Sequence, residues 1–374
     1  MSPRERTAPR LVGAYRGCAL MVLNGLLTLL LINLAAALLL ALLPQRSGSQ
    51  LYRDEVLAQA YPGWSEDDRR QLLDETWNRT YRYEPYVQFR EQAFSGRFVN
   101  VSSAGFRQGP EDPDWPPREG EESVFVFGGS TAFGYGVADH ETLPAALGRH
   151  LEATCGRPLP VYNLARSNYY STQERILFTQ LLSAGQVPRA AVFLDGLNDT
   201  LYDRDEPKFT GRLAALMDES DTSVRRRAVK TLALFRLLRR LQPTGPDAVT
   251  AGDPGRAPQV LERWRRNRQL TTATAEAAGA HALFVWQPVP AWGYDLEHHL
   301  FADTGIPAAE LLARVYQRMD RERDPEDPQF LWLADVQEGR QDLFYIDRVH
   351  YSAAFNAELA GHIAERLSPV LCPP

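Results

Sequence analysis

Several residue types and motifs that mark particular protein classes are scarce or missing in this chain of 374 residues. Its three cysteines are too few for a disulfide framework and form no C-x-x-C pair, which argues against thiolate metal binding and thioredoxin-like redox chemistry. Lysine occurs only as Lys208 and Lys230, and the formal net charge is −6. Because an acidic chain binds nucleic acid poorly, we expect no nucleic-acid partner, and we expect no metal site.

The chain does contain enough apolar material for a large core. Apolar residues make up 44% and charged residues 24%, which is typical of globular proteins and excludes a wholly disordered, collagenous or coiled-coil chain. The length allows two or three domains, but a single α/β domain with an extension fits equally well.

The chain runs without a charged residue from Gly17 to Pro44. At about 1.5 Å per residue, a helix of this length exceeds the roughly 30 Å hydrocarbon core of a bilayer. Arginines dominate residues 1–16, so the positive-inside rule predicts a cytoplasmic N-terminus, a transmembrane anchor at 17–44 and a periplasmic or extracellular remainder of a single-pass membrane protein. A cleaved signal peptide is the alternative, but the apolar region of such peptides is usually only about 7–15 residues long.

The three cysteines occupy different parts of the chain. Cys18 lies in the apolar segment, where a cysteine inside a helix is the simplest interpretation. Cys155 and Cys372 fall in the exported part, where an oxidising compartment would permit a disulfide. The sequence leaves open whether these two are bonded or are unrelated thiols.

Residues 45–119 form a polar, aromatic extension, with one helix expected after Ser65 and a Pro-rich acidic linker at 109–122. From residue 120 to the end, short apolar runs alternate with helix-length segments. The runs are Val124–Phe127, Val161–Leu164, Ala190–Leu194, Ala282–Trp286 and Phe330–Leu333. This alternation predicts a three-layer α/β/α domain with a mostly parallel, roughly five-stranded, flavodoxin-like sheet, preceded by one transmembrane helix.

Three further local features of this domain can be predicted. The Ser171–Glu174 segment has the spacing of a capping box, and Ser352 can cap the last helix. Residues 205–280 are long for a crossover, so we interpret them as an insertion or lid. Within them, Arg225–Arg240 fits either a solvated amphipathic helix, which we favour, or a helix that binds anionic lipid or acidic polysaccharide.

The first patch of residues that could carry out chemistry follows the apolar run at 124–127. There Gly128 and Gly129 precede Ser130 and Thr131, so the chain can turn sharply and expose the Ser130 hydroxyl at the carboxyl end of a strand. Ser130 is therefore a candidate nucleophile. An ordinary β-α turn and a phosphate-binding loop are the alternatives, and the absence of G-x-x-x-x-G-K-[ST] and G-x-G-x-x-G weakens the latter.

The second patch follows the run at 190–194 and contains Gly196, Asn198 and Asp199. A side-chain amide at the carboxyl end of a strand can donate a hydrogen bond to a developing oxyanion. Taken alone, a turn asparagine is the more economical interpretation.

The third patch precedes the last helix and contains Asp347 and His350. A carboxylate three residues before a histidine can hold Nδ1–H and leave Nε2 free to take a proton from a serine, although a structural Asp–His turn is the alternative. Each patch arises easily by chance, but all three in this order on one parallel sheet would meet at the same edge.

In these residues the chain resembles the SGNH (GDSL-like) hydrolase superfamily over roughly residues 100–370. The segment 128–131 matches the serine block with Gly129 in place of the commoner aspartate, 196–199 matches G-x-N-D, and 347–350 matches D-x-x-H. The segment 98–107 resembles the lead-in of membrane-anchored bacterial members. In the glycine block, Ala165 and Asn168 replace the usual glycines, and asparagine tolerates left-handed geometry.

The resemblance implies acyl transfer by Ser130 as nucleophile, His350 as base and Asp347 as its orienting carboxylate, with no cofactor. It implies an oxyanion hole built from the Ser130 N–H, the Asn198 side chain and an N–H near Asn168, supported by Gly129, Gly196 and Asp199. The expected partner is an acyl-ester substrate, such as an ester of a carbohydrate or lipid.

Three functions remain open at this stage. An esterase is favoured over an O-acyltransferase that modifies an envelope polysaccharide beside a membrane acyltransferase partner, and over a non-catalytic glycan- or partner-binding domain. The aromatic residues Trp286 and Trp292 would suit stacking against a sugar ring, but packing explains them equally well.

Overall fold

The computed structural model describes residues 8–42, 53–217, 232–241 and 252–372. The chain divides into two compact units: Met1–Arg46 with Arg212–Asp247, and Ser47–Gly211 with Ala248–Pro374. The larger unit contains the predicted parallel sheet.

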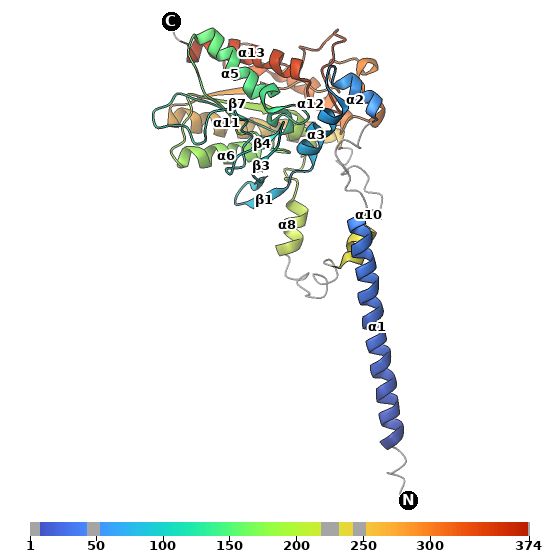
Figure 1. Ribbon diagram of the computed structural model, residues 1–374. Coiled ribbons are helices and arrows are strands. Elements are labelled where there is room, and N and C mark those ends of the chain that lie inside the picture. Colours follow the sequence, from blue (N-terminus) through green and yellow to red (C-terminus); the bar gives the residue numbers. More distant parts are fainter. Residues whose placement is uncertain (1–7, 43–52, 218–231, 242–251, 373–374) are drawn as a thin grey trace, which may run out of the picture. The chain divides into compact units, whose positions relative to one another are not determined.

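The sheet of the larger unit has five parallel strands in the order β6-β5-β7-β8-β9 (Figure 1). Because the second strand in sequence lies at one edge and the others follow in order on the far side of the first, this is the flavodoxin-like order that the sequence predicts. The strands are β5 (Val124–Gly128), β6 (Val161–Asn163), β7 (Ala190–Asp195), β8 (His281–Trp286) and β9 (Phe330–Trp332).

Helices cover both faces of the sheet. One face carries α5 (Leu143–Cys155) and α13 (Ala353–Leu371), which pack against each other. The opposite face carries α6 (Ser171–Ser183), α11 (Ala257–Ala278) and α12 (Ala309–Glu322). The predicted three-layer architecture is confirmed.

The alternation of side-chain direction along each strand explains why both faces of the sheet are apolar. In β5, Phe125 and Phe127 join the core under α6 and α11, whereas Val124 and Val126 join the core under α5 and α13. Successive strand side chains point to opposite faces, so an apolar run without polar interruptions fits only a strand covered on both sides.

All three predicted helices begin where the sequence places them, and only the capping box at Ser171 is wrong. Ser65 caps α3 (Glu66–Trp77) by accepting from Asp68 N–H, and Ser352 caps α13 by accepting from Phe355 N–H. In α6 the N-cap is Tyr170 and its side chain makes no cap. Ser171 is the first residue of the helix and not its N-cap, so the predicted capping box is absent, and the Ser171 hydroxyl donates to Asp199.

The extension consists of small elements with well-defined ends. They are α2 (Asp54–Ala60), α3, the hairpin of β1 (Tyr81–Glu84) and β2 (Gln88–Glu91), and the pair β3 (Phe94–Ser95) and β4 (Asn100–Val101). Leu57, Leu72 and Leu73 are buried in a small core that also contains Val137 and Ile346 of the main domain. The extension is therefore packed onto the domain.

The long connection between β7 and β8 contains α7 (Leu197–Leu201), α8 (Thr210–Met217), α10 (Ala233–Leu241) and α11. Because α11 packs against α6 and β8, it is the crossover helix, and only the residues before it exceed an ordinary β-α-β connection. The predicted Arg-rich helix begins at 225, but residues 225–231 lie outside the described part. The lid role stays a prediction.

The smaller unit contains α1 (Ala8–Leu42) and α10. Tyr15–Leu42 within α1 has a mean hydropathy of 2.5 and is long and apolar enough to cross a membrane. Asn33 in this segment accepts a hydrogen bond from the N–H of Leu234 in α10. Within α10, Leu237 is buried and Leu238 is exposed.

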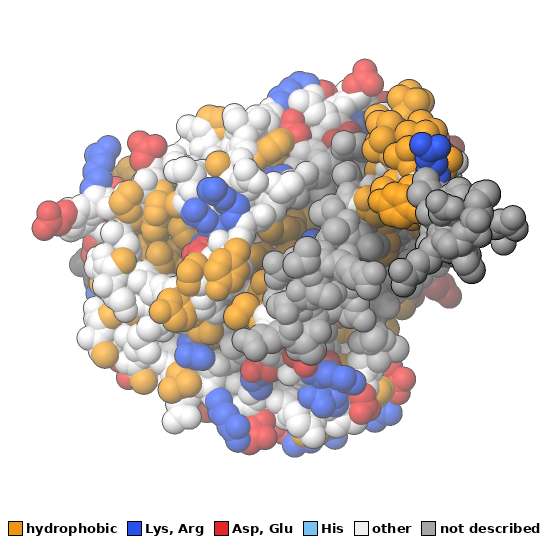
Figure 2. Space-filling model, turned by 90° about the horizontal axis from the view of Figure 1, so that it is seen from below, with side chains coloured by type: hydrophobic (Ala, Val, Ile, Leu, Met, Phe, Trp, Pro, Cys, Tyr) orange, Lys and Arg blue, Asp and Glu red, His pale blue; other side chains and the backbone are white. Residues whose placement is uncertain are grey.

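Cys155 and Cys372 form a disulfide, with their Cα atoms 5.0 Å apart. Cys155 ends α5 and Cys372 follows α13, so the bond joins two helices that already pack together. The free cysteine Cys18 is exposed on α1. On the molecular face that Figure 2 shows, basic and acidic side chains are interspersed.

Candidate active site

Ser130 lies where strand β5 ends at the carboxyl edge of the sheet. It is the first residue of α4 (Ser130–Phe133), with Gly129 as N-cap, and its side chain is only partly buried. The first N–H groups of a helix have no partner within that helix. The Ser130 hydroxyl and backbone N–H therefore lie together at an open helix start.

His350 is held between a carboxylate and this serine. Its Nε2 lies 2.8 Å from Ser130 Oγ, and its Nδ1 lies 2.6 Å from Asp347 Oδ2. Asp347 Oδ1 also accepts the backbone N–H groups of Val349 and His350, at 2.9 and 2.8 Å. The tight turn that the Asp347–His350 spacing suggested is thus present, and it is aligned with the serine.

The charge state of Asp347 follows from its partners. Burial alone would raise the pKa of this carboxyl, but the adjacent His350 and two backbone N–H donors outweigh that effect and lower the pKa below its ordinary value. Asp347 is therefore an anion at neutral pH, and an anionic acceptor at Nδ1 favours the His350 tautomer in which Nε2, the atom that faces Ser130, is the unprotonated nitrogen.

Aromatic rings enclose the imidazole of His350. Tyr135 stacks on it with centroids 5.3 Å apart and planes at 20°, and Trp77 meets it edge-on at 5.8 Å and 75°. His350 is 5% exposed. Trp77 comes from the extension, which the sequence did not associate with the site.

Asn198 lies directly beside the serine turn. Gly196 has a φ of +112°, a conformation that side chains rarely adopt, and it starts the short helix α7 that carries Asn198. Asn198 Nδ2 donates to Tyr169 O at 2.7 Å, and a Cβ at Gly129 would collide with this same Nδ2. The glycine that replaces the family aspartate therefore leaves room for the amide group of Asn198, which has a second N–H beyond the one donated to Tyr169 O.

Asn168 adopts the backbone conformation that the glycine block would require. Its φ is +64°, and its side chain is fixed by a 2.6 Å bond to Ser167 Oγ and a 3.0 Å bond from the Tyr202 hydroxyl. The side chain thus contacts neighbouring residues of the loop. Its role as a backbone donor stays a prediction.

The model of the GDSL-like Lipase/Acylhydrolase family matches residues 126–357, which include all four sequence blocks. The chain belongs to this family. It is accordingly a hydrolase of ester bonds.

Three of the solved structures that match this chain have low sequence identity to it. TesA is 17% identical (67% of this chain, 99% of that chain, TM-score 0.37), and the lipase Lip_vut3 from a goat rumen metagenome is 13% identical (67% and 97%, 0.39). Est24, a carbohydrate acetylesterase from Sinorhizobium meliloti, is 13% identical (67% and 100%, 0.35). No curated protein matches the sequence.

In this GDSL-like hydrolase, Asp199 supports the helix that carries Asn198. Its Oδ1 accepts from the Ser171 hydroxyl at 2.5 Å, which ties α7 to α6. Asp199 is fully buried near Asp195 and Glu174, and burial raises the pKa of all three carboxyls. Asp195 accepts from the indole N–H of Trp264 at 2.8 Å.

Gln287 is a site-supporting residue that the sequence did not reveal. Its Oε1 accepts from the hydroxyl of Thr131 at 2.7 Å and lies 2.9 Å from the hydroxyl of Tyr351. For the aromatic residues of this stretch the sequence left sugar stacking and packing open. Trp286 is fully buried, so packing is the correct alternative there, and Trp292 donates to Asp335.

Arg107 and Asn100 of the lead-in meet at Asp139, just beyond α4. Arg107 Nε donates to Asp139 Oδ1 at 2.8 Å, Asn100 Nδ2 donates to Asp139 Oδ2 at 2.8 Å, and Arg107 also donates to the carbonyls of Phe133 and Val137. The sequence showed the lead-in segment 98–107, but it did not predict these contacts with Asp139. It fixes the loop that follows the serine helix.

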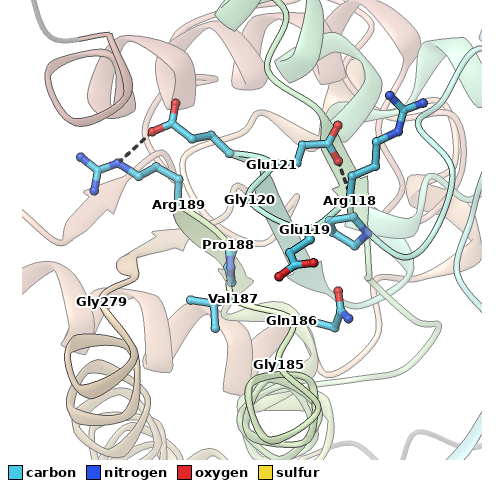
Figure 3. A pocket seen from close by; sticks show the side chains of 12 residues that line it. Arg118, Glu119, Gly120, Glu121, Gly185, Gln186, Val187, Pro188, Arg189 and Gly279 are labelled. Atoms are coloured by element: carbon cyan, nitrogen blue, oxygen red, sulfur yellow. Dashed lines mark hydrogen bonds and ion pairs between the residues drawn. The ribbon is translucent and has the colours of Figure 1, made fainter.

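One prominent cavity lies at the opposite edge of the sheet. It has a volume of about 610 Å³ and is lined by the segments 117–122 and 185–189 together with Gly279, at the amino ends of β5, β7 and β8 (Figure 3). Figure 3 shows acidic and basic side chains around it. Because Ser130 follows the carboxyl end of β5, this cavity is separate from the candidate active site.

Proposed function

We propose that this protein is a membrane-anchored, extracytoplasmic serine esterase in which Ser130, His350 and Asp347 form the catalytic triad. The observation that carries the proposal is the continuous alignment of Asp347, His350 and Ser130 through contacts of 2.6 and 2.8 Å. The family supplies the reaction class, and the site supplies the groups that each step requires.

In the first step, His350 Nε2 takes the proton of Ser130 as Oγ attacks the carbonyl carbon of an ester. His350 then gives this proton to the departing alcohol, which leaves an acyl group on Ser130. In the second step, His350 activates a water molecule that releases the acid and regenerates the serine. Asp347 stabilises the imidazolium throughout.

The negative charge that develops on the carbonyl oxygen needs donors in place before the reaction. The Ser130 N–H, the Asn198 amide and an N–H near Asn168 are assigned this role, with Asn198 supported by its position against Gly129. One oxyanion donor is typically worth about 3 kcal/mol of transition-state stabilisation. No part of this sequence of steps calls for a cofactor.

The location is proposed from the N-terminal segment and the cysteines. The segment Tyr15–Leu42 is long enough to anchor the chain, and the basic residues before it favour a cytoplasmic N-terminus. A disulfide between Cys155 and Cys372 is in keeping with an oxidising compartment outside the cytoplasm. The substrate would then be an ester of a carbohydrate or lipid at the outer surface of the membrane.

The test is hydrolysis of p-nitrophenyl acetate by the full chain in detergent, compared with Ser130→Ala, His350→Ala and Asn198→Ala. We expect the first two to abolish turnover and the third to lower kcat by about 10²–10³-fold. His362→Ala serves as the control, since the His362 side chain is 42% exposed and its Nδ1 lies 3.8 Å from Glu365 Oε2. Wild-type turnover that persists in Ser130→Ala would refute the triad.

A further inference from the structure

The extension reaches the candidate catalytic histidine through the last residue of α3. The indole of Trp77 meets the His350 ring at 5.8 Å and 75°. The family match begins at residue 126, so α3 lies outside the part of the chain that is common to the family. This contact is therefore an addition to the family domain, made by the protein's own N-terminal segment.

Trp77 contacts two rings at once. Besides His350, it meets Tyr135 edge-on at 5.0 Å and 78°, and Tyr135 in turn stacks on His350. The imidazole is thus bordered on two sides by aromatic rings. Trp77 itself is half-buried.

The end of α3 is fixed more firmly than packing alone would require. Glu75, two residues before Trp77, accepts the backbone N–H groups of three successive residues with its carboxylate, at 3.0, 2.8 and 3.0 Å; these residues are Arg97, Phe98 and Val99. The carbonyl of Glu75 accepts from Arg79 Nη1 at 2.8 Å.

Arg79 connects the end of α3 to α4, the helix that begins at Ser130. Its guanidinium lies over the rings of Phe133 and Tyr135, with the Cζ atom 4.7 and 5.1 Å from their centroids. Phe133 ends α4, the helix that Ser130 begins. The residues around Trp77 are thus tied both to the extension and to the element that carries the nucleophile.

From these contacts we propose that Trp77 is a positioning residue, which holds the imidazole of His350 in line between Asp347 and Ser130. The proposal rests on the proposed function of the triad. The two hydrogen bonds hold the ring nitrogens of His350, and rotation about the side-chain torsions of His350 would break both bonds. The rings of Trp77 and Tyr135, which pack against the imidazole, restrict that rotation.

The experiment compares Trp77→Leu and Trp77→Phe with Trp64→Leu in the full-length protein. Trp64 is a matched control because it lies in the same extension and its indole packs on Phe98, with centroids 5.1 Å apart. We expect Trp77→Leu to lower kcat for p-nitrophenyl acetate by about tenfold, while KM changes by less than about twofold. Trp77→Phe should recover most of the loss, and Trp64→Leu should retain wild-type kcat.

A second readout separates this proposal from the proposed function. In NMR spectra of histidine-labelled protein, Trp77→Leu should shift the ring resonances of His350, whereas Trp64→Leu should leave them in place. If the wild type neither hydrolyses esters nor reacts with a fluorophosphonate, the proposed function fails, and the NMR comparison still tests whether Trp77 orders the ring. Unchanged kcat and unchanged His350 resonances in Trp77→Leu would overturn the proposal, as would an equal loss of kcat in Trp64→Leu.

Discussion

Gln287 Oε1 accepts a hydrogen bond of 2.7 Å from the hydroxyl of Thr131, the residue that follows Ser130. The same oxygen lies 2.9 Å from the hydroxyl of Tyr351, the residue that follows His350. Gln287 itself follows β8, a strand that carries neither Thr131 nor Tyr351. One buried amide thus spans the distance between the serine turn and the histidine turn.

Replacing Gln287 with leucine should lower kcat more than the loss of a buried hydrogen bond elsewhere in the protein would. It leaves the Thr131 hydroxyl without its acceptor, at a cost of about 1–3 kcal/mol in unfolding free energy. We also expect kcat to fall by about tenfold, because the two turns lose their common support. Kinetics and chemical denaturation of the same variant measure both effects.

Gln337 provides the matched control for that prediction. It is equally buried, donates to the carbonyls of Val289 and Trp292 and accepts from the hydroxyl of Tyr345 at 2.5 Å, but among the described residues its hydrogen bonds go to neither Thr131 nor Tyr351. Gln337→Leu should therefore destabilise the fold by a similar amount and leave kcat closer to that of the wild type. Equal losses of kcat in the two variants would count against a specific role for Gln287.

Gly129→Ala should impair catalysis while the fold persists. The added Cβ would meet Asn198 Nδ2 and displace the amide from its place beside Ser130. We expect kcat to fall by about 10²-fold, comparable to the loss of an oxyanion donor. Gly148→Ala is the control, because its Cβ would make only ordinary contacts with Val161, the nearest at 3.6 Å. Retained activity in Gly129→Ala would contradict the placement of Asn198.

Glu75 should make stability depend on pH in the acid range. Burial raises the pKa of this carboxyl, but hydrogen bonds from Arg97, Phe98, Val99 and Gln71 outweigh burial and lower the pKa from its ordinary value near 4.5. Since the folded state then favours the ionised form, the carboxylate stabilises the protein above that ordinary value. Its contribution disappears as pH falls through the lowered pKa of the folded state.

Glu75→Gln should accordingly be less stable than the wild type at neutral pH, and the difference should shrink below about pH 4.5. Denaturant unfolding at pH 7 and at successively lower pH measures this difference. The exposed Glu119 supplies the control, and Glu119→Gln should track the wild type at every pH. A difference that grows as pH falls would show that the sign is wrong.

Loss of the disulfide should destabilise the protein. Cys155 and Cys372 are 217 residues apart in sequence, so the bond restricts a large part of the unfolded chain. We expect the double variant with serine at both positions to lose about 2–4 kcal/mol of unfolding free energy. A reducing agent should lower the melting temperature of the wild type but not that of the double variant. Cys18→Ser should behave as the wild type does.

The sequence by itself determined the sheet and the order of the site residues. Apolar runs bounded by glycine, proline or polar residues placed all five strands, because a strand buried on both faces has to be apolar throughout. The same reasoning put Ser130, Asn198 and the Asp347–His350 turn at one edge, since the carboxyl ends of parallel strands meet there. These features are local in sequence or follow from strand direction.

Only the tertiary structure decided which side chains support those residues. Ser171 has the pattern of a helix cap, yet it is the first residue of α6, and its hydroxyl donates to Asp199 and accepts from Asn267. Trp77, Arg107 and Gln287 join the site from segments distant in sequence, and periodicity carries no signal for such contacts. Local patterns record which face of an element is buried. The partner that buries it is determined only when the whole chain has packed.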